Sequence, residues 1–214
     1  DVYKRQALEL GLDVMFEQGD WRSAVDPDRL ETILREDTSA NIKAVCIVHN
    51  ETSTAVTSDI GSIRQAMDAA NHPALLLVDT ISSLASLPYH HKRWGVDVTV
   101  GGSQKGLMLP PGLGLNVVSN KAREAAKSAS LPKSYWNWEA IIEANGNGFF
   151  PYTPPTNLLY GLAEAQKLLL DEGMTQVYAR HARYGAATRA ASQAWGLETV
   201  CRQPENPVSY THLT

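Results

Sequence analysis

The sequence predicts an α/β fold in which helices sandwich a mainly parallel sheet. Short apolar runs alternate with segments whose apolar residues recur at helical spacing, which is typical of such layered domains. The run at residues 42–49 is apolar at nearly every position, as expected for a strand covered on both faces. A similar run at residues 75–79 ends in Asp79, and a third ends in paired glycines shortly before Lys105.

Local signals predict the other elements in chain order. Residues 12–17 predict a short strand. Asp26 and Pro27 then mark a helix start, because Asp caps helices and Pro suits the first helical position. Asp59 caps a second helix, which ends near Asn71. The remaining predictions are strands at residues 96–100 and 113–118, helices at residues 121–129, 156–171 and 175–195, and an irregular connection at residues 131–155.

Composition excludes several classes of protein. The chain has 214 residues, of which 43% are hydrophobic and 20% charged, and its formal charge is −4, which suits one large domain or most of one. This mild acidity argues against nucleic acid or an anionic membrane as the main partner. Cys46 and Cys201 are too few for a disulfide framework, and Cys46 is expected to be an inert buried thiol. A reduced, cytoplasmic location is the default expectation.

Both ends of the sequence are predicted to be foreign to the domain. Residues 1–6 and 208–213 can be encoded by DNA segments that are reverse complements of each other and match a transposon end used to fragment DNA for sequencing. We therefore expect adapter-derived tails at residues 1–6 and 208–214, and the domain at residues 7–200. Different codons at either end of the source nucleotide read would contradict this hypothesis.

Three chemically useful side chains lie at or just after predicted strand ends: His49, Asp79 and Lys105. Ligands of parallel sheets bind beyond the carboxyl ends of the strands. A lysine amine there can form a Schiff base with pyridoxal phosphate, whose ring nitrogen needs a carboxylate partner such as Asp79. Alone, Lys105 also fits a solvated turn and Asp79 a helix cap or turn, but the pair at separate strand ends is more specific.

The phosphate of such a cofactor needs hydroxyl and N–H donors. Ser103, Gln104 and Thr153 can supply them, and the paired glycines Gly101 and Gly102 let the backbone approach closely. Other chemistries are poorly supported. No Gly-x-Ser-x-Gly hydrolase elbow or P-loop order is present. A metal site is not expected, because the adjacent His pair and the two cysteines lack ligand spacing.

Five segments of the sequence together resemble class V aminotransferases, most closely the branch of serine–glyoxylate and alanine–glyoxylate aminotransferases. The resemblance covers nearly all of residues 7–200 and implies the large domain of a fold-type I pyridoxal-phosphate enzyme that works as a homodimer. The segments are His49-Asn-Glu-Thr-Ser-Thr54, Val78-Asp79-Thr-Ile-Ser-Ser-Leu84, Trp94-Gly-Val-Asp97, Gly102-Ser-Gln-Lys105-Gly-Leu-Met-Leu-Pro-Pro-Gly112 and Phe150-Pro-Tyr-Thr-Pro154.

The resemblance also implies roles for individual residues. Lys105 would be the Schiff-base lysine and proton carrier, and Asp79 would pair with the ring nitrogen of pyridoxal 5'-phosphate. Thr52 would lie at the ring hydroxyl, Ile81 would pack on one ring face, and Gln104 would contact the phosphate. For Ile81, a place in the ordinary hydrophobic core is an equal alternative.

The aromatic region of the resemblance is expected to act between subunits. Thr153 would reach the phosphate bound in the neighbouring subunit of the homodimer, with Tyr152 as a second candidate. Residues 135–138 would line the dimer interface or the substrate. The implied reaction moves an amino group from serine or alanine to glyoxylate. The alternatives are another class V enzyme, such as a lyase, a desulfurase or a transaminase with a different donor, and a non-catalytic scaffold of the same fold.

Two departures from the family pattern affect these expectations. Ala55 stands where the family usually has Gly, and it is expected to be tolerated if its φ is negative. The family's glycine-rich phosphate loop and ring-stacking aromatic should precede residue 7, and its substrate-binding arginine lies in a C-terminal small domain. We therefore expect the isolated chain to bind the cofactor weakly or not at all and to be inactive alone.

Overall fold

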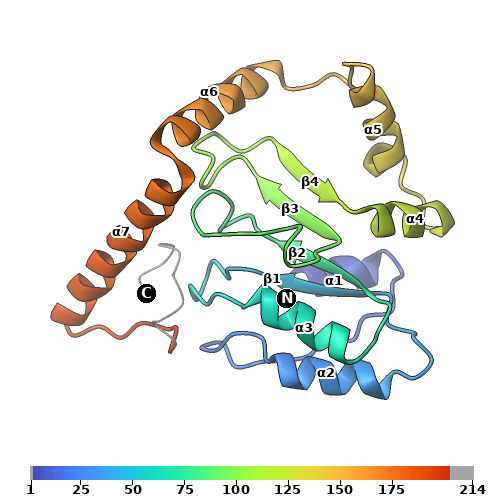
Figure 1. The fold of residues 1–214 in the computed structure, drawn as a ribbon, viewed down its shortest axis with the longest axis horizontal. Coiled ribbons are helices and arrows are strands. Elements are labelled where there is room, and N and C mark those ends of the chain that lie inside the picture. Colours follow the sequence, from blue (N-terminus) through green and yellow to red (C-terminus); the bar gives the residue numbers. More distant parts are fainter. Residues whose placement is uncertain (1, 203–214) are drawn as a thin grey trace.

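The structure is a computed structural model that describes residues 2–202, so the predicted tail at residues 208–214 lies outside the described part. A mixed sheet forms the centre, and the C-terminal helices extend along its periphery (Figure 1). In chain order the elements are α1 (Val2–Glu9), α2 (Pro27–Glu36), β1 (Ala44–Val48), α3 (Ile60–Ala69), β2 (Leu75–Asp79), β3 (Val98–Gly102), β4 (Gly114–Val118), α4 (Asn120–Ser128), η1 (Ser134–Trp136), α5 (Trp138–Gly146), α6 (Thr156–Glu172) and α7 (Met174–Ala194).

The sheet has four strands in the order β1-β2-β3-β4. The first three strands are parallel, and β4 pairs antiparallel with β3, so the predicted mainly parallel α/β architecture is confirmed. The register places Val48, Asp79 and Val100 beside one another across β1, β2 and β3. The carboxyl ends of the three parallel strands therefore meet at one edge of the sheet.

The two predicted helix starts form as expected. The Asp26 carboxylate accepts backbone N–H bonds from Asp28 and Arg29 at the start of α2, and the Asp59 carboxylate accepts one from Ser62 in α3. Helix α3 then packs its apolar stripe on one face of the sheet. The main core consists of buried side chains from α2, α3, β1 and β2 and their flanks, namely Leu34, Val45, Ile47, Ile60, Ile63, Met67, Ala74, Leu76, Val78 and Val96.

The opposite face of the sheet is much more open. Strand side chains alternate between faces, so Cys46 points away from the α3 side, on which Val45 and Ile47 are buried. Cys46 is exposed, and the prediction of a buried thiol was wrong because only one face of β1 is covered. Helix α1 lies on the side of the sheet opposite to α3 (Figure 1). Asp79 belongs to this open face, since it alternates with buried Val78.

Two local predictions differ from the structure. Residues 12–17 form no strand; within this stretch Leu12, Met15 and Phe16 are exposed. The connection at residues 131–155 is less irregular than predicted, because it contains η1 and helix α5. The Asn137 side chain caps α5 by accepting the backbone N–H of Glu139.

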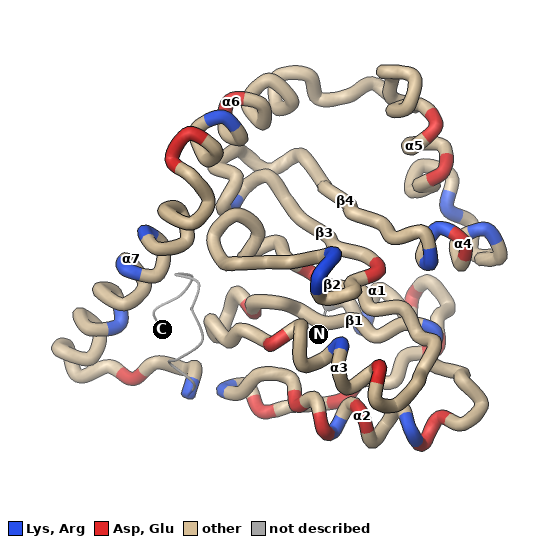
Figure 2. Tube along the Cα trace, in the orientation of Figure 1, with Lys and Arg blue, Asp and Glu red and all other residues tan. Residues whose placement is uncertain are grey.

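The charges on the surface are mixed. Lys and Arg alternate with Asp and Glu along α2, and most exposed helices carry scattered charges (Figure 2). Arg35 and Glu31 form an ion pair of 2.6 Å within α2. Among the helices of residues 2–202, none is both long and apolar enough to cross a membrane.

The loop after β1 contains a backbone strain that the sequence did not predict. Ala55 has a φ of +58°, in the left-handed region, so the condition under which alanine is expected to be tolerated there, a negative φ, is not met. Its N–H donates to the Glu51 carbonyl at 2.8 Å, which closes a tight loop. A non-glycine residue in this conformation costs roughly 1–2 kcal/mol.

Ala55→Gly is therefore expected to raise the free energy of unfolding by about 1 kcal/mol, because glycine adopts this φ without strain. Urea unfolding of the variant and the parent chain checks this. The matched control is Ala129→Gly, since Ala129 has an ordinary φ of −71° and should gain nothing. Equal effects at the two positions would contradict the prediction.

Candidate functional site

The Asp79 carboxylate lies at the end of β2 with its two oxygens in different roles. Its Oδ1 accepts the backbone N–H of Ile81 at 2.8 Å, which fixes the orientation of the carboxylate. Its Oδ2 accepts the phenol O–H of Tyr3 at 2.8 Å. The hydrogen bond to Asp79 raises the pKa of the Tyr3 phenol to about 12. The structure thus shows that Oδ2 is directed toward a donor on the open face of the sheet.

The Lys105 loop follows β3 and is held by Ser103. The Ser103 hydroxyl donates to the Pro110 carbonyl at 2.7 Å and accepts the Leu113 N–H at 3.2 Å. Ser103 is fully buried, so its hydroxyl closes this loop and is not presented to a phosphate. The suggestion that Ser103 is a phosphate donor was therefore wrong. Lys105 itself is half-buried, and Gln104 is exposed at the start of the loop.

Glycine at position 102 lets the loop after β3 approach the turn after β2. A Cβ there would lie 2.9 Å from Ile81 Cδ1 and 2.8 Å from Gln104 Oε1. Gly106 lies equally close to this turn, since its Cβ would meet the Leu84 carbonyl at 2.2 Å. The structure therefore brings Ile81, Gln104 and the Lys105 loop together, as the predicted site requires.

Thr52 joins this region from the loop after β1. Its hydroxyl forms a short hydrogen bond with the hydroxyl of Ser82, in the turn that follows Asp79. Beneath this contact, the buried hydroxyl of Ser83 bonds His49 Nδ1 at 2.8 Å. The strand-end loops of β1 and β2 are therefore tied together by two neighbouring serines.

His49 is part of the buried floor of the site. It is 3% exposed and packs against the rings of Tyr89 and Trp94. Burial lowers the pKa of His49 to about 4, against a weaker opposing effect of Asp59. The imidazole is therefore neutral at physiological pH and acts as a hydrogen-bonding group.

This burial predicts a pH dependence of stability. The unfolded chain takes up a proton on His49 near pH 6.5, whereas the folded chain does so only near pH 4. As the pH falls through this window, the unfolded state binds more protons, and His49 lowers the free energy of unfolding by up to about 3 kcal/mol. His49→Asn, whose amide can donate or accept a hydrogen bond near the Nδ1 position, should flatten this slope in urea unfolding between these pH values.

Burial also lowers the pKa values of His91 and His181, and both the parent chain and the His49→Asn variant contain these residues. The difference between the two slopes therefore reports the contribution of His49. An unchanged slope in the variant would mean that His49 is not the group that titrates.

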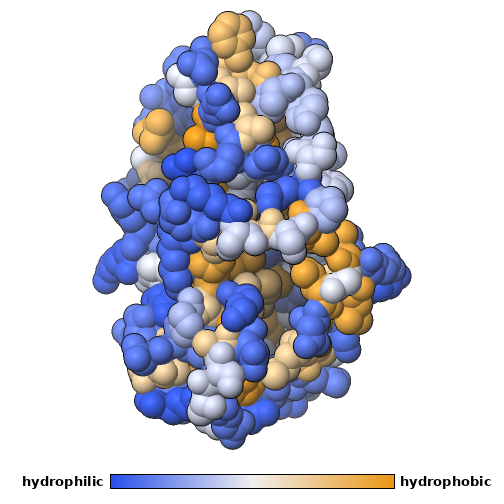
Figure 3. All heavy atoms as spheres, turned by 90° about the vertical axis from the view of Figure 1, so that its right-hand side faces the viewer, coloured by the Kyte–Doolittle hydropathy of each residue, from blue (hydrophilic) through white to orange (hydrophobic). Residues whose placement is uncertain are grey.

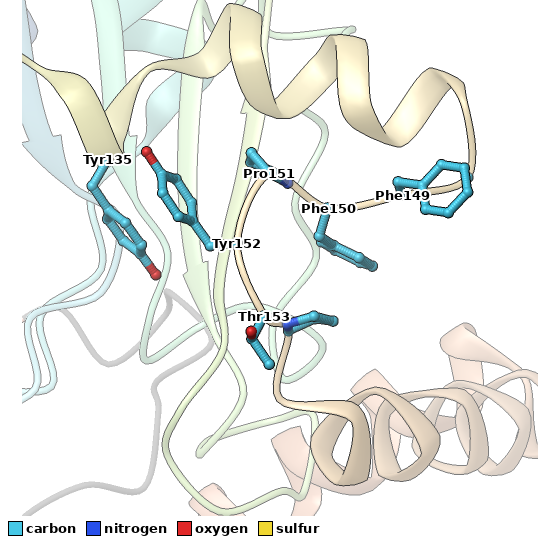
Figure 4. Close-up of a pocket in the computed structure, with 8 residues that line it drawn as sticks. Tyr135, Phe149, Phe150, Pro151, Tyr152 and Thr153 are labelled. Atoms are coloured by element: carbon cyan, nitrogen blue, oxygen red, sulfur yellow. The ribbon is translucent and has the colours of Figure 1, made fainter.

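Thr153 lies elsewhere, in the exposed segment between α5 and α6. It lines an open pocket with Tyr135, Tyr152 and residues 148–151 and 154, and this lining includes neither Asp79 nor Lys105. The Tyr135 and Tyr152 rings lie with centroids 4.8 Å apart, and both rings are exposed (Figure 4). Within this chain, the structure does not bring Thr153 together with the strand-end site.

Two contacts at the site involve residues outside the predicted set. Ser82 lies within one of the family motifs but has no predicted role, and its Thr52 contact joins residues 30 positions apart in the chain. Tyr3 was assigned to an adapter-derived tail, yet it belongs to α1 and contacts Asp79. No local sequence signal could have revealed either contact. Within residues 2–202, no three His, Cys, Asp or Glu side chains come together to hold a metal ion.

Comparisons with known proteins agree on one family. The family model described as Aminotransferase class-V matches residues 3–208. A serine–glyoxylate aminotransferase of Methylorubrum extorquens is 52% identical over 204 residues, which cover 93% of this chain and 51% of that protein. An L-aspartate–glyoxylate aminotransferase of Paracoccus denitrificans is 45% identical, with coverages of 91% and 49%.

A solved structure gives the same fold. The crystal structure of an alanine–glyoxylate aminotransferase from Nostoc sp. matches with a TM-score of 0.82 and 28% identity, covering 91% of this chain and 51% of that one. The chain spans about half the length of the relatives that it matches.

Proposed function

Because the chain belongs to the class-V aminotransferase family, we propose that it forms the lysine-bearing part of a pyridoxal-phosphate-dependent transaminase. The proposed reaction moves an amino group from serine or alanine to glyoxylate. The observation that carries the proposal is that Asp79 and the Lys105 loop lie at the ends of the neighbouring strands β2 and β3, with Gly102 close to Ile81.

The residues present fit the cofactor that class-V aminotransferases use. Asp79 Oδ2 already accepts a donor, the Tyr3 hydroxyl, and a protonated ring nitrogen is a donor of the same kind. Bound there, pyridoxal phosphate supplies an electron sink for the negative charge that develops at the substrate Cα. Asp79 would hold the ring nitrogen protonated, and the backbone N–H of Ile81 orients its carboxylate.

The other residues have supporting roles in this proposal. The Lys105 amine would hold the cofactor through its aldehyde and would carry the proton at the substrate Cα. Thr52 would donate toward the ring hydroxyl, the Ile81 side chain would pack on the ring, and the exposed Gln104 amide would contact the phosphate. Ser103 contributes indirectly, because it fixes the loop that presents Lys105.

A homodimer is part of the proposal. Thr153 would serve the phosphate site of the neighbouring subunit, which accounts for its distance from the site of its own chain. The surrounding aromatics are exposed as an interface requires, with Tyr135 62%, Trp136 73% and Phe149 71% exposed. Figure 3 shows apolar patches among polar side chains on the side of α4 and α5. A reduced cytoplasmic location also belongs to the proposal, and the exposed thiol of Cys46 is compatible with it.

Product analysis tests the reaction. The full-length protein that contains this chain is incubated with pyridoxal phosphate, glyoxylate and either serine, alanine or L-aspartate. Glycine and the 2-oxo acid of the donor should form in equal amounts, with serine or alanine preferred. A preference for L-aspartate would replace serine and alanine as the proposed donors, while release of ammonia without glycine would replace the transaminase by a lyase.

A further inference from the structure

Ser82 makes a contact that none of the proposed roles explains. Its hydroxyl meets that of Thr52, although the two residues lie on loops after different strands. Ser82 is 7% exposed, whereas Thr52 is half-buried at the edge of the site. The buried partner can therefore act as a fixed support for the more accessible one.

Either of the two hydroxyls can be the donor in this contact. A hydroxyl has one proton to donate and two lone pairs to accept. When Ser82 donates to Thr52, the Thr52 proton stays available for an acceptor in the site. In the described part of the chain, the Thr52 hydroxyl makes no other hydrogen bond, so the Ser82 contact is the hydrogen bond that favours one rotamer of Thr52.

The neighbouring serines provide a contrast. Ser83 is fully buried and its hydroxyl bonds His49, away from Thr52. Ser53, next to Thr52, is exposed, and its hydroxyl bonds Glu51 at 2.7 Å. Only Ser82 combines burial with a contact to the predicted cofactor residue.

We propose that Ser82 is a positioning residue for Thr52, and that it directs the Thr52 hydroxyl toward the ring oxygen of pyridoxal phosphate. This inference rests on the proposed function, since it assumes that Thr52 meets the cofactor ring. It adds a residue that acts on the cofactor only through another side chain.

A double-mutant cycle tests the inference. Ser82→Ala is made in the 214-residue chain and in its Thr52→Val variant, which removes the hydroxyl and keeps the shape. Titration with pyridoxal phosphate then gives ratios of dissociation constants. Ser82→Ala should weaken binding about fivefold when Thr52 is present and less than about twofold in the Thr52→Val chain. In a Thr52→Ser chain, which keeps the hydroxyl, the effect should persist.

Two control variants separate positioning from general damage. Ser53→Ala and Ser83→Ala alter neighbouring hydroxyls, and neither should couple to Thr52→Val. Equal losses from Ser82→Ala in both backgrounds, or no loss in either, would overturn the proposal.

A cofactor-free readout separates this inference from the proposed function. The same cycle is measured in urea, where the Ser82 and Thr52 substitutions should couple by about fivefold in the unfolding equilibrium constant. If the parent chain binds no cofactor, the assignment of the cofactor site to this chain fails, whereas this coupling still supports Ser82 as the support of Thr52. Absence of the coupling overturns the inference whatever the cofactor result.

Discussion

Lys105→Arg is expected to abolish the covalent attachment of pyridoxal phosphate to this chain. A guanidinium stays protonated and cannot attack an aldehyde, whereas the lysine amine can. The chain is incubated with the cofactor, reduced with borohydride, digested and analysed by mass spectrometry. The peptide that contains Lys105 should carry one cofactor in the parent chain and none in the variant.

Lys127→Arg is the matched control, because Lys127 is an exposed helix residue paired with Glu124. This variant should keep the adduct at Lys105. If the parent chain is labelled at its exposed lysines as readily as at Lys105, the role proposed for Lys105 is refuted.

Asp97→Ala is expected to lower the free energy of unfolding by about 3 kcal/mol, because it removes a buried carboxylate and leaves a buried N–H unpaired. Asp97 is 5% exposed and links three segments. Its Oδ2 accepts the backbone N–H of Leu76 in β2, and its Oδ1 accepts the hydroxyl of Ser119, each at 2.9 Å. The Lys121 ammonium lies 3.7 Å away.

Urea unfolding of the purified chains measures this loss. Asp68→Ala is the control, since Asp68 also pairs with a cation, Arg64, but its side chain is 67% exposed. Exposed ion pairs contribute little, so this variant should change the free energy of unfolding by less than about 0.5 kcal/mol. Similar losses in the two variants would show that burial of Asp97 is not the cause.

The strands and helices that the sequence predicts well are those defined by their own residues. Residues 75–79 form β2 as predicted, because the run is apolar and ends at a polar residue. Capping by Asp26 and Asp59 is local too. The prediction of a strand at residues 12–17 is wrong for the opposite reason. A strand needs a neighbouring strand to pair with, and within the described residues this segment has none.

For the site, too, some features could be predicted from the sequence and others could not. Asp79 and Lys105 could be placed together from sequence, because parallel strands bring their carboxyl ends to one edge. The exposure of Cys46 could not be foreseen, since an apolar run does not reveal whether one face of its strand stays open. The left-handed Ala55 and the hydroxyl pair of Thr52 and Ser82 depend on loop geometry that no periodicity encodes.

The hydrogen bond between Tyr3 and Asp79 makes α1 an intramolecular competitor of a ligand that binds at Asp79 Oδ2. A ligand whose donor approaches Asp79 Oδ2 from the side that the phenol occupies must displace the phenol, so its apparent dissociation constant is the intrinsic one divided by the fraction of molecules with α1 detached. Because the competitor belongs to the same chain, dilution does not relieve the competition. A chain without residues 1–6 is free of it, and the affinity of this site therefore depends on what precedes residue 7.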